Sequence, residues 1–217
     1  MASFDHVVIA VRDPGQTAVR LEARYGLRAH QDGARHPWGT ANRVIPLEPP
    51  EYLELLHVVD ERALAQQDPV LHGVMQRAEH ADFLLGWVVR DVDIEQVAQQ
   101  VGARLSDEEA HGAETSSAWR YVERPDAPLG FPGFIAYRAA EERLSRWRRR
   151  YEEAAHPRPP GPLEWVEISG TSGSCQQIVQ VVPGLDIRCS EGVPEVRGIG
   201  FRSRAQVVAL RNADLRP

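Results

Sequence analysis

Two side chains that could transfer protons or bind a metal interrupt apolar stretches near the start of the chain. His6 stands in a run of apolar, β-branched residues, and Glu54 stands among leucines. A buried imidazole must find partners for its ring nitrogens, and a carboxylate is rarely buried unless it is paired or binds a cation. A metal between the two would satisfy both. Alternatively, Glu54 accepts hydrogen bonds from Asn42, Arg43 or His6 and organises a cavity.

A second polar segment, HPWGTANR at residues 36–43, lies between these two positions. Trp38 precedes a glycine, which adopts backbone conformations that other residues resist, so we predict a loop whose aromatic side chain folds over a cavity mouth. Arg43 carries a rigid fork of donors suited to a carboxylate or phosphate, and Asn42 can donate and accept. The alternative is that these two residues tie the loop to strand ends and to Glu54. We assign substrate binding to His36, Trp38, Asn42 and Arg43.

Arginine supplies all 25 basic residues, because the chain contains no lysine. A Schiff-base lysine and a phosphate-loop lysine are therefore both absent, and we expect neither pyridoxal phosphate (PLP) nor a nucleotide as cofactor. The net charge of −6 argues against a nucleic-acid partner. Any anion held in a cavity must be held by arginine, histidine, backbone or a metal.

The chain of 217 residues is long enough for one medium domain or two small ones. Its first residues have no basic region or apolar run typical of a signal peptide, and no stretch approaches the roughly 20 apolar residues of a membrane span. Cys175 and Cys189 are too few for a disulfide framework. We therefore expect a reduced, cytoplasmic protein with no membrane partner.

The apolar pattern of the first 60 residues predicts the order strand, helix, strand, strand, strand. The strands are expected at residues 4–12, 27–31, 41–47 and 52–59, and the helix between Asp13 and Gly26. The order recurs with a strand at 84–91, a helix at 92–101 and strands at 104–106, 117–122 and 133–137. A fainter third copy comprises a strand at 163–169, a helix at 174–181 and strands at 185–189, 196–202 and 207–211.

Two connecting segments separate these modules. The first contains one or two short helices, and the second is an arginine-rich helix followed by a proline-rich linker. Acidic residues four positions from the arginines predict a charge-compensated helix surface rather than a nucleic-acid patch. The predicted organisation is a first module at 1–60, a helical connector at 61–81, a second module at 82–138, a helix and linker at 139–162 and a third, partial module at 163–217.

Three segments in this order, FDHVVIAV at 4–11, RHPWGTANR at 35–43 and YLELL at 52–56, resemble the glyoxalase-like family of the vicinal oxygen chelate (glyoxalase/bleomycin resistance/dioxygenase) superfamily. The middle segment is the most specific of them. The resemblance implies an α+β fold in which repeated βαβββ modules form curved mixed sheets around a cavity. Because two modules in one chain can pair internally, we expect a monomer or a homodimer.

In metal-using members of this superfamily, the first and last strands of each module supply metal ligands, and the metal stabilises an enolate or a similar anion. The resemblance places His6 and Glu54 at these positions, as metal ligands and catalytic residues. The second module offers neither a carboxylate nor a histidine in its last strand, so a third ligand would come from Glu164 or Glu167. Two ligands and several waters suit Mg²⁺ or Mn²⁺, whereas a tight zinc site usually needs three. Glyoxalase I activity is therefore not expected.

Two functions fit these observations, besides a catalytically silent scaffold that would have a filled cavity and no solvent-accessible pocket at His6. The first is a glyoxalase-like enzyme, a lyase or isomerase that acts on a small oxygen-rich metabolite with one divalent metal (Mg, Mn, Ni or Zn). Glu54 or His6 would then be ligand or general base, and Arg43 would anchor the anion. The second is a metal-free protein that binds and sequesters a small molecule. Its cavity would be lined by Trp38, Trp87 and Trp165.

Overall fold

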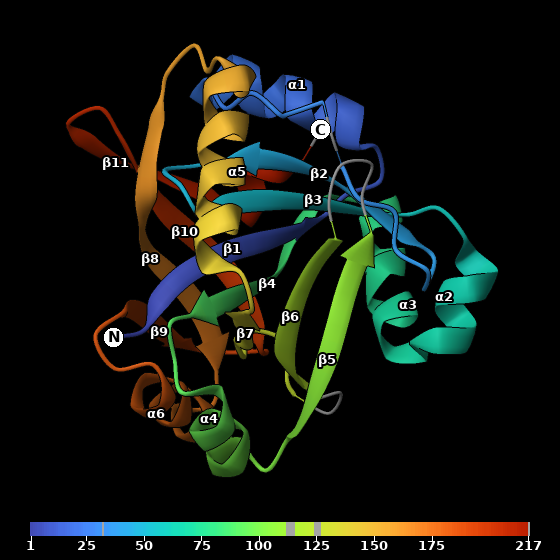
Figure 1. Ribbon diagram of the computed structural model, residues 1–217, viewed down its shortest axis with the longest axis vertical. Coiled ribbons are helices and arrows are strands. Elements are labelled where there is room, and N and C mark those ends of the chain that lie inside the picture. Colours follow the sequence, from blue (N-terminus) through green and yellow to red (C-terminus); the bar gives the residue numbers. More distant parts are fainter. Residues whose placement is uncertain (32, 112–115, 124–126, 217) are drawn as a thin grey trace.

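Two halves of similar construction lie side by side in one seven-stranded sheet (Figure 1). The computed structural model describes residues 1–31, 33–111, 116–123 and 127–216. The strands of this sheet follow the order β2-β3-β1-β4-β7-β6-β5. They are β1 (Ser3–Ala10), β2 (Thr40–Pro46), β3 (Tyr52–Val58), β4 (Phe83–Arg90), β5 (Arg104–His111), β6 (Ser116–Glu123) and β7 (Gly133–Tyr137).

Each half pairs its first strand with its last strand in parallel, β1 with β3 and β4 with β7. The antiparallel pairing of β1 with β4 joins the halves. The helices α1 (Pro14–Tyr25) and α4 (Ile94–Val101) begin at aspartate caps and end at Gly26 and Gly102, which adopt the left-handed conformation that favours glycine. The predicted α+β fold with curved mixed sheets is confirmed.

One predicted strand of the first half is wrong. Residues 27–31 form no strand, although the backbone N–H of His30 donates to the carbonyl of Val44 in β2 at 2.9 Å. A single hydrogen bond does not make a ladder. The segment therefore runs beside β2 only briefly and leads into the loop that approaches the cavity.

The C-terminal part forms a second sheet of four strands in the order β11-β10-β8-β9. Its elements are β8 (Pro160–Gly170), α6 (Ser172–Val181), β9 (Asp186–Glu191), β10 (Glu195–Ser203), β11 (Gln206–Arg211) and the short 3₁₀ helix η2 (Asn212–Leu215). The order of elements repeats that of the second half, but β8 is parallel to β9, its second strand, rather than to its last. β8 also begins inside the segment predicted as a linker.

The two faces of the larger sheet serve different purposes because side chains alternate along each strand. Val7 and Ile9 of β1 and Leu53 and Leu55 of β3 are fully buried in the main core. That core extends to α1, α4 and the smaller sheet, whose strand β10 packs against β4. The inner face is left to line a cavity.

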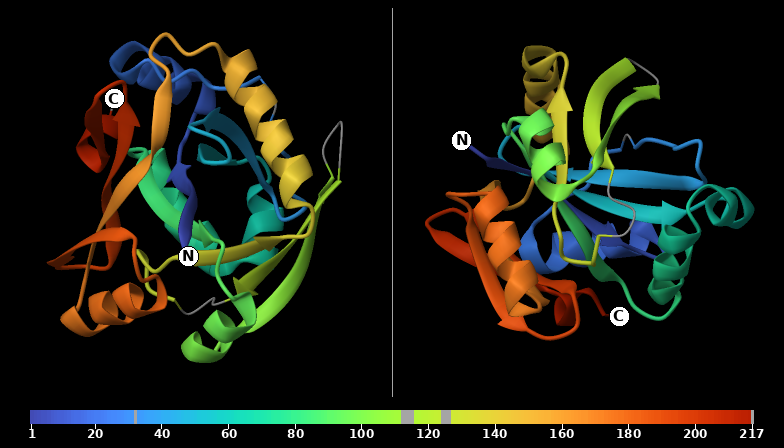
Figure 2. Two further views of the ribbon diagram at one scale, coloured as in Figure 1. Left: turned by 60° about the vertical axis from the view of Figure 1, so that its left-hand side comes forward. Right: turned by 90° about the horizontal axis from the view of Figure 1, so that it is seen from below.

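Helices cover this inner face at both ends of the first half (Figure 2). The helix α5 (Ala140–Ala154) crosses it and stacks Trp147 on Tyr52 of β3. A smaller apolar cluster, which includes Leu56 and Leu64, joins the sheet to the helical connector between the two halves. That connector comprises α2 (Glu61–Gln67), α3 (Pro69–Met75) and the 3₁₀ helix η1 (Gln76–Glu79). None of the helices in the described ranges has the length and apolar character that crossing a bilayer requires.

Glu51 connects the two sheets through a largely buried carboxylate. Its Oε2 accepts the backbone N–H of Leu163 in β8 at 2.6 Å, and Arg90 lies 3.9 Å from Oε1. Burial outweighs these favourable contacts and raises the pKa of Glu51 to about 7. The folded protein therefore favours the protonated form of this residue.

We predict that Glu51→Gln removes a pH dependence of stability. As pH rises from about 4.5 to about 7, Glu51 ionises in the unfolded chain but stays protonated in the folded one, so the free energy of unfolding falls. The fall approaches about 3 kcal/mol at roughly 1.4 kcal/mol per pH unit. Urea unfolding of both proteins at several pH values should show that the variant gains stability relative to the native chain across this range. Parallel profiles would contradict the prediction.

Candidate functional site

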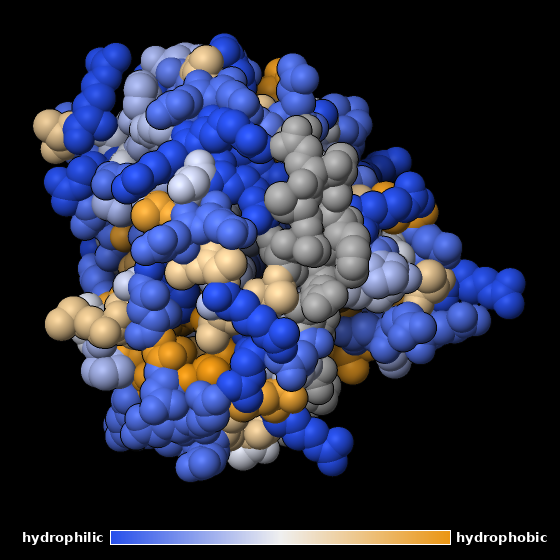
Figure 3. Space-filling model, viewed as in Figure 1, coloured by the Kyte–Doolittle hydropathy of each residue, from blue (hydrophilic) through white to orange (hydrophobic). Residues whose placement is uncertain are grey.

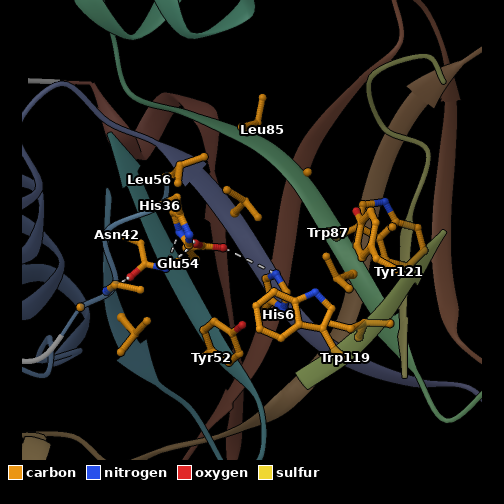
Figure 4. Close-up of a pocket in the computed structure, with 18 of the residues that line it drawn as sticks. His6, His36, Asn42, Tyr52, Glu54, Leu56, Leu85, Trp87, Trp119 and Tyr121 are labelled. Carbon is orange, nitrogen blue, oxygen red and sulfur yellow. Dashed lines mark hydrogen bonds and ion pairs between the residues drawn. The ribbon is translucent and has the colours of Figure 1, made fainter. Parts of the chain in front are cut away.

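The inner face of the larger sheet encloses a cavity of about 1050 Å³. Strands β1, β2 and β3 form one wall, and β4, β6 and β7 form another (Figure 4). The helix α5, the loop at residues 33–38 and the junction of α2 with α3 also line it. Polar side chains gather on the first wall, and aromatic rings dominate the second.

His6 and Glu54 face each other across this first wall. Parallel pairing of β1 with β3 sets Val8 beside Glu54 and His6 beside Tyr52, so both polar side chains project from the same face (Figure 4). His6 Nε2 lies 3.6 Å from Glu54 Oε2, and only 9% and 12% of the two side chains are exposed. The pairing predicted from the sequence therefore exists at the cavity wall.

Asp5 fixes the orientation of the His6 ring. A register irregularity of β1 between Phe4 and His6 interrupts the alternation and brings these neighbouring side chains together. Asp5 Oδ1 lies 2.6 Å from His6 Nδ1 and accepts the hydroxyl of Tyr137 at 3.0 Å, while Oδ2 accepts from Arg143 at 2.7 Å. The carboxylate is fully buried.

The charge state of Asp5 follows from these contacts. Burial alone would raise its pKa, but the hydrogen bond from His6 and the charge of Arg143 outweigh burial and lower it. An ionised Asp5 only accepts hydrogen bonds, so the proton of His6 lies on Nδ1. Nε2 is then the ring nitrogen that faces the cavity and Glu54.

The other carboxylate oxygen of Glu54 is held by the loop and β2. Asn42 Nδ2 donates to Oε1 at 2.6 Å, and His36 Nε2 lies 3.8 Å from the same oxygen. Asn42 also accepts the backbone N–H of Ala34 at 2.7 Å, which ties the loop to this carboxylate. Burial would raise the pKa of Glu54, but the nearby His36 and His6 and the hydrogen bond from Asn42 outweigh burial and lower the pKa.

Three of the four residues assigned to substrate binding line the cavity, and Arg43 does not. His36 and Trp38 stack at 4.5 Å, with 8° between the ring planes. Gly39 has a φ of 97°, and a Cβ there would lie 2.4 Å from the carbonyl oxygen of Asp60, so the turn after Trp38 requires glycine. Arg43 follows Asn42 on β2, and alternation directs it to the opposite face of the sheet.

A stack of three rings connects His6 to α5. The His6 and Tyr52 ring centres are 4.5 Å apart, and those of Tyr52 and Trp147 are 4.1 Å apart. Trp38, Trp87, Trp119 and Trp147 all line the cavity. Trp165, expected in this lining, instead lies in the smaller sheet under the guanidinium of Arg188.

Comparison with known proteins identifies the family. The glyoxalase-like domain family matches residues 4–176, well over half of the chain. The chain belongs to this family. No curated protein matches it. The inner cavity is therefore that of a glyoxalase-like domain, with the vicinal oxygen chelate fold.

Several solved structures are similar to this chain at low sequence identity, and the first of them shares its fold over nearly the whole length. A hypothetical protein from Staphylococcus aureus has a TM-score of 0.68 at 15% identity and covers 96% of this chain and 98% of its own. Methylmalonyl-CoA epimerase from Streptomyces coelicolor, in complex with 2-nitronate-propionyl-CoA, has a TM-score of 0.45 at 16% identity, over 64% of this chain and 96% of its own. The epimerase from Mycobacterium tuberculosis has a TM-score of 0.44 at 18% identity, over 62% and 86%.

The donor atoms of this glyoxalase-like domain fall short of a three-ligand metal site. Among the described residues, no group of three or more His, Cys, Asp or Glu side chains could hold a metal ion. Glu164 and Glu167, the expected sources of a third ligand, instead pair with Arg202 and Arg211 on the smaller sheet. His6 and Glu54 thus supply two donors, and a tight zinc site usually needs three.

Sequence reasoning missed Asp5 and the cavity side of α5. Asp5 carried a signal, because a carboxylate beside a histidine in an apolar strand can orient its ring. The charge pattern of α5 predicts a compensated surface for its arginines. The structure shows Arg149 paired with Glu153 at 3.8 Å, yet places Arg143, Arg146, Arg149 and Arg150 in the cavity lining.

We predict that Asp5→Asn destabilises the fold. It removes the negative charge that balances the buried Arg143, and breaking a buried ion pair costs about 3–5 kcal/mol. Urea unfolding should reveal this loss. Asp186→Asn is the matched control, because its pair with Arg188 is half exposed and should contribute little. Equal effects of the two substitutions would contradict a special role for Asp5.

Proposed function

We propose that this glyoxalase-like domain is an enzyme that moves a proton on a carbon next to a carbonyl in a small, oxygen-bearing metabolite. The observation that carries the proposal is the pair formed by His6 Nε2 and Glu54 Oε2, 3.6 Å apart at the cavity wall. Asp5 and Asn42 hold the far side of each partner. Fixed orientation of this kind is what acid–base catalysis requires.

A proton between His6 Nε2 and Glu54 Oε2 would stabilise this pair. With its Nδ1 proton directed to Asp5, a neutral His6 would present a lone pair to the Glu54 carboxylate, and two acceptors so close repel each other. A proton on Nε2 removes this repulsion. The proposed reaction therefore starts from a proton on His6 Nε2 beside an ionised Glu54.

In the proposed reaction, Glu54 acts as the base and His6 acts as the acid. Glu54 takes the proton from the substrate carbon, and His6 gives its Nε2 proton to the carbonyl oxygen, so an enol forms without free charge. His6 then takes back a hydroxyl proton of the enol, and Glu54 delivers its proton to the neighbouring carbon on the same face, which yields an isomer. Asn42 keeps Oε1 occupied, which leaves Oε2 as the reacting oxygen.

A binding protein is the second candidate, and the cavity lining favours it. Four tryptophans, together with Tyr52, Tyr121 and Tyr137, surround a volume large enough for a drug-sized molecule. In such a protein, His6 and Glu54 would only stabilise the wall. Turnover distinguishes the two candidates.

We predict that the native chain exchanges the acidic C–H protons of its substrate with solvent. Proton NMR in D₂O over a panel of 2-oxo acids, 2-hydroxy aldehydes and 1,3-dicarbonyl compounds should detect this exchange. Glu54→Gln or His6→Asn should slow it by about 10²-fold or more, because each removes one proton carrier.

Glu164→Gln is the matched control, since that carboxylate lies outside the cavity. It should leave the exchange rate unchanged. Exchange at the native rate in both site variants would refute the proposed roles. Binding of a panel compound with no exchange by the native chain would favour the binding protein.

A metal-assisted version of the reaction has its own test. The contact from Asp5 to His6 resembles the support that metal-ligating histidines receive, but two donors suit only a weakly held ion. We expect micromolar Zn²⁺, Ni²⁺ or Mn²⁺ to leave the Tm of the native chain unchanged. A rise in Tm that both His6→Asn and Glu54→Gln abolish would show that the two donors suffice and would favour the metal-assisted reaction.

A further inference from the structure

The helix α5 presents arginine to the cavity at a regular spacing. Arg143, Arg146 and Arg150 recur three and four positions apart, on the side of the helix that carries Trp147, and all of them line the cavity. The molecular face in Figure 3 is mostly hydrophilic, with a hydrophobic region at its lower left, and charged residues of α5 such as Glu141 and Arg148 are exposed. The cationic wall lies across from the sheet that carries His6 and Glu54.

These arginines have different surroundings. Arg143 is buried, its charge is balanced by Asp5 at 2.7 Å, and its guanidinium lies 3.9 Å from the centre of the Tyr137 ring. Arg150 lies 5.1 Å from the centre of the Trp147 ring, and Arg146 and Arg150 are half-buried. A guanidinium has five N–H donors in a planar fork, so one side chain can bind a group of the protein and a ligand at the same time.

The carboxylates of the described lining are already engaged elsewhere. Glu54 lies on the sheet wall with Asn42 and His6, and Asp68 accepts the backbone N–H of Leu71 as the cap of α3. An incoming anion is therefore favoured at α5 and disfavoured beside Glu54. Partial burial strengthens this preference, because charges interact more strongly away from bulk water.

The three-ring stack separates these two regions. Trp147, beside Arg150, stands at one end, and His6 stands at the other, with Tyr52 between them. Trp119 and Tyr121 line the facing wall (Figure 4). A flat, apolar body fits between such rings, with an anionic group toward α5 and the reacting carbon toward His6 and Glu54.

We propose that the substrate is a flat, largely apolar metabolite whose carboxylate or phosphate is bound by Arg146 and Arg150 of α5. This proposal rests on the proposed function for the placement of the reacting carbon, but the anion site is defined by α5 alone. The two arginines determine specificity and act on the anion, not on the reacting proton.

Three probes with one aromatic body test the anion site: 1-naphthoate, 1-naphthyl phosphate and neutral 1-naphthol. Isothermal titration calorimetry at low salt should show tighter binding of an anionic probe than of the neutral one. Arg146→Gln and Arg150→Gln should each weaken the anions by about tenfold, as for lost hydrogen bonds to charged groups, and leave 1-naphthol unchanged. The preferred anion identifies the group as a carboxylate or a phosphate.

Arg148→Gln is the matched control, because this arginine of the same helix is exposed and lies outside the cavity. It should change none of the affinities. Equal binding of all three probes by the native chain, failure of both anions to bind, or an equal effect of Arg148→Gln would overturn the proposal.

The test also separates this inference from the proposed function. Glu54→Gln and His6→Asn should keep the preference for the anionic probe while they lose proton exchange. If the arginine variants bind all probes normally and the site variants still lose exchange, the anion site is refuted and the enzyme stands. If the arginine variants lose the anions and the site variants exchange normally, the reverse holds.

Discussion

The buried carboxylate of Asp5 is the interaction on which the rest of the site depends. It joins three parts of the chain, because His6 lies beside it on β1, Tyr137 reaches it from β7 and Arg143 reaches it from α5. Burial of a charge is costly unless the charge is paired and hydrogen-bonded, and here these contacts satisfy both oxygens. The same contacts that stabilise the carboxylate also direct His6 Nε2 to the cavity and hold α5 across it.

The two halves of the sheet contribute different kinds of residue to the cavity. The first half supplies His6, Glu54, Asn42 and His36, whereas the second supplies Gly133, Trp119, Tyr121 and other uncharged residues to the wall. A Cβ at Gly133 would lie 2.0 Å from the Tyr121 hydroxyl, so glycine at this strand position leaves room for the Tyr121 side chain. Similar strands in the two halves therefore form two different walls. One wall carries the polar groups of the site, and the other determines the shape of the cavity.

The sequence was sufficient for the parts of this arrangement that local rules determine. The helix cap at Asp13, the glycines that end α1 and α4, and the alternation of β1 and β3 follow from short-range geometry. The placement of His6 and Glu54 at one site came instead from the resemblance to a known family, because only strand pairing brings these two residues together. The failures are tertiary. Strand pairing decides that β8 neighbours β9, and the packing of α5 decides that its arginines line a cavity. Neither the pairing of β8 with β9 nor the packing of α5 can be predicted from a short stretch of sequence.

Arg43 and Arg143 illustrate this limit and also show why arginine suits the site. Both have the same donors, but one faces away from the cavity on β2 and the other is buried between Asp5 and Tyr137. Burial would lower the pKa of Arg143, yet the neighbouring Tyr137 and Asp5 outweigh burial and raise it. A buried lysine readily loses its charge, whereas arginine keeps it. The cation that balances Asp5 therefore stays charged in its buried site, and this charge favours the ionised Asp5 that orients His6.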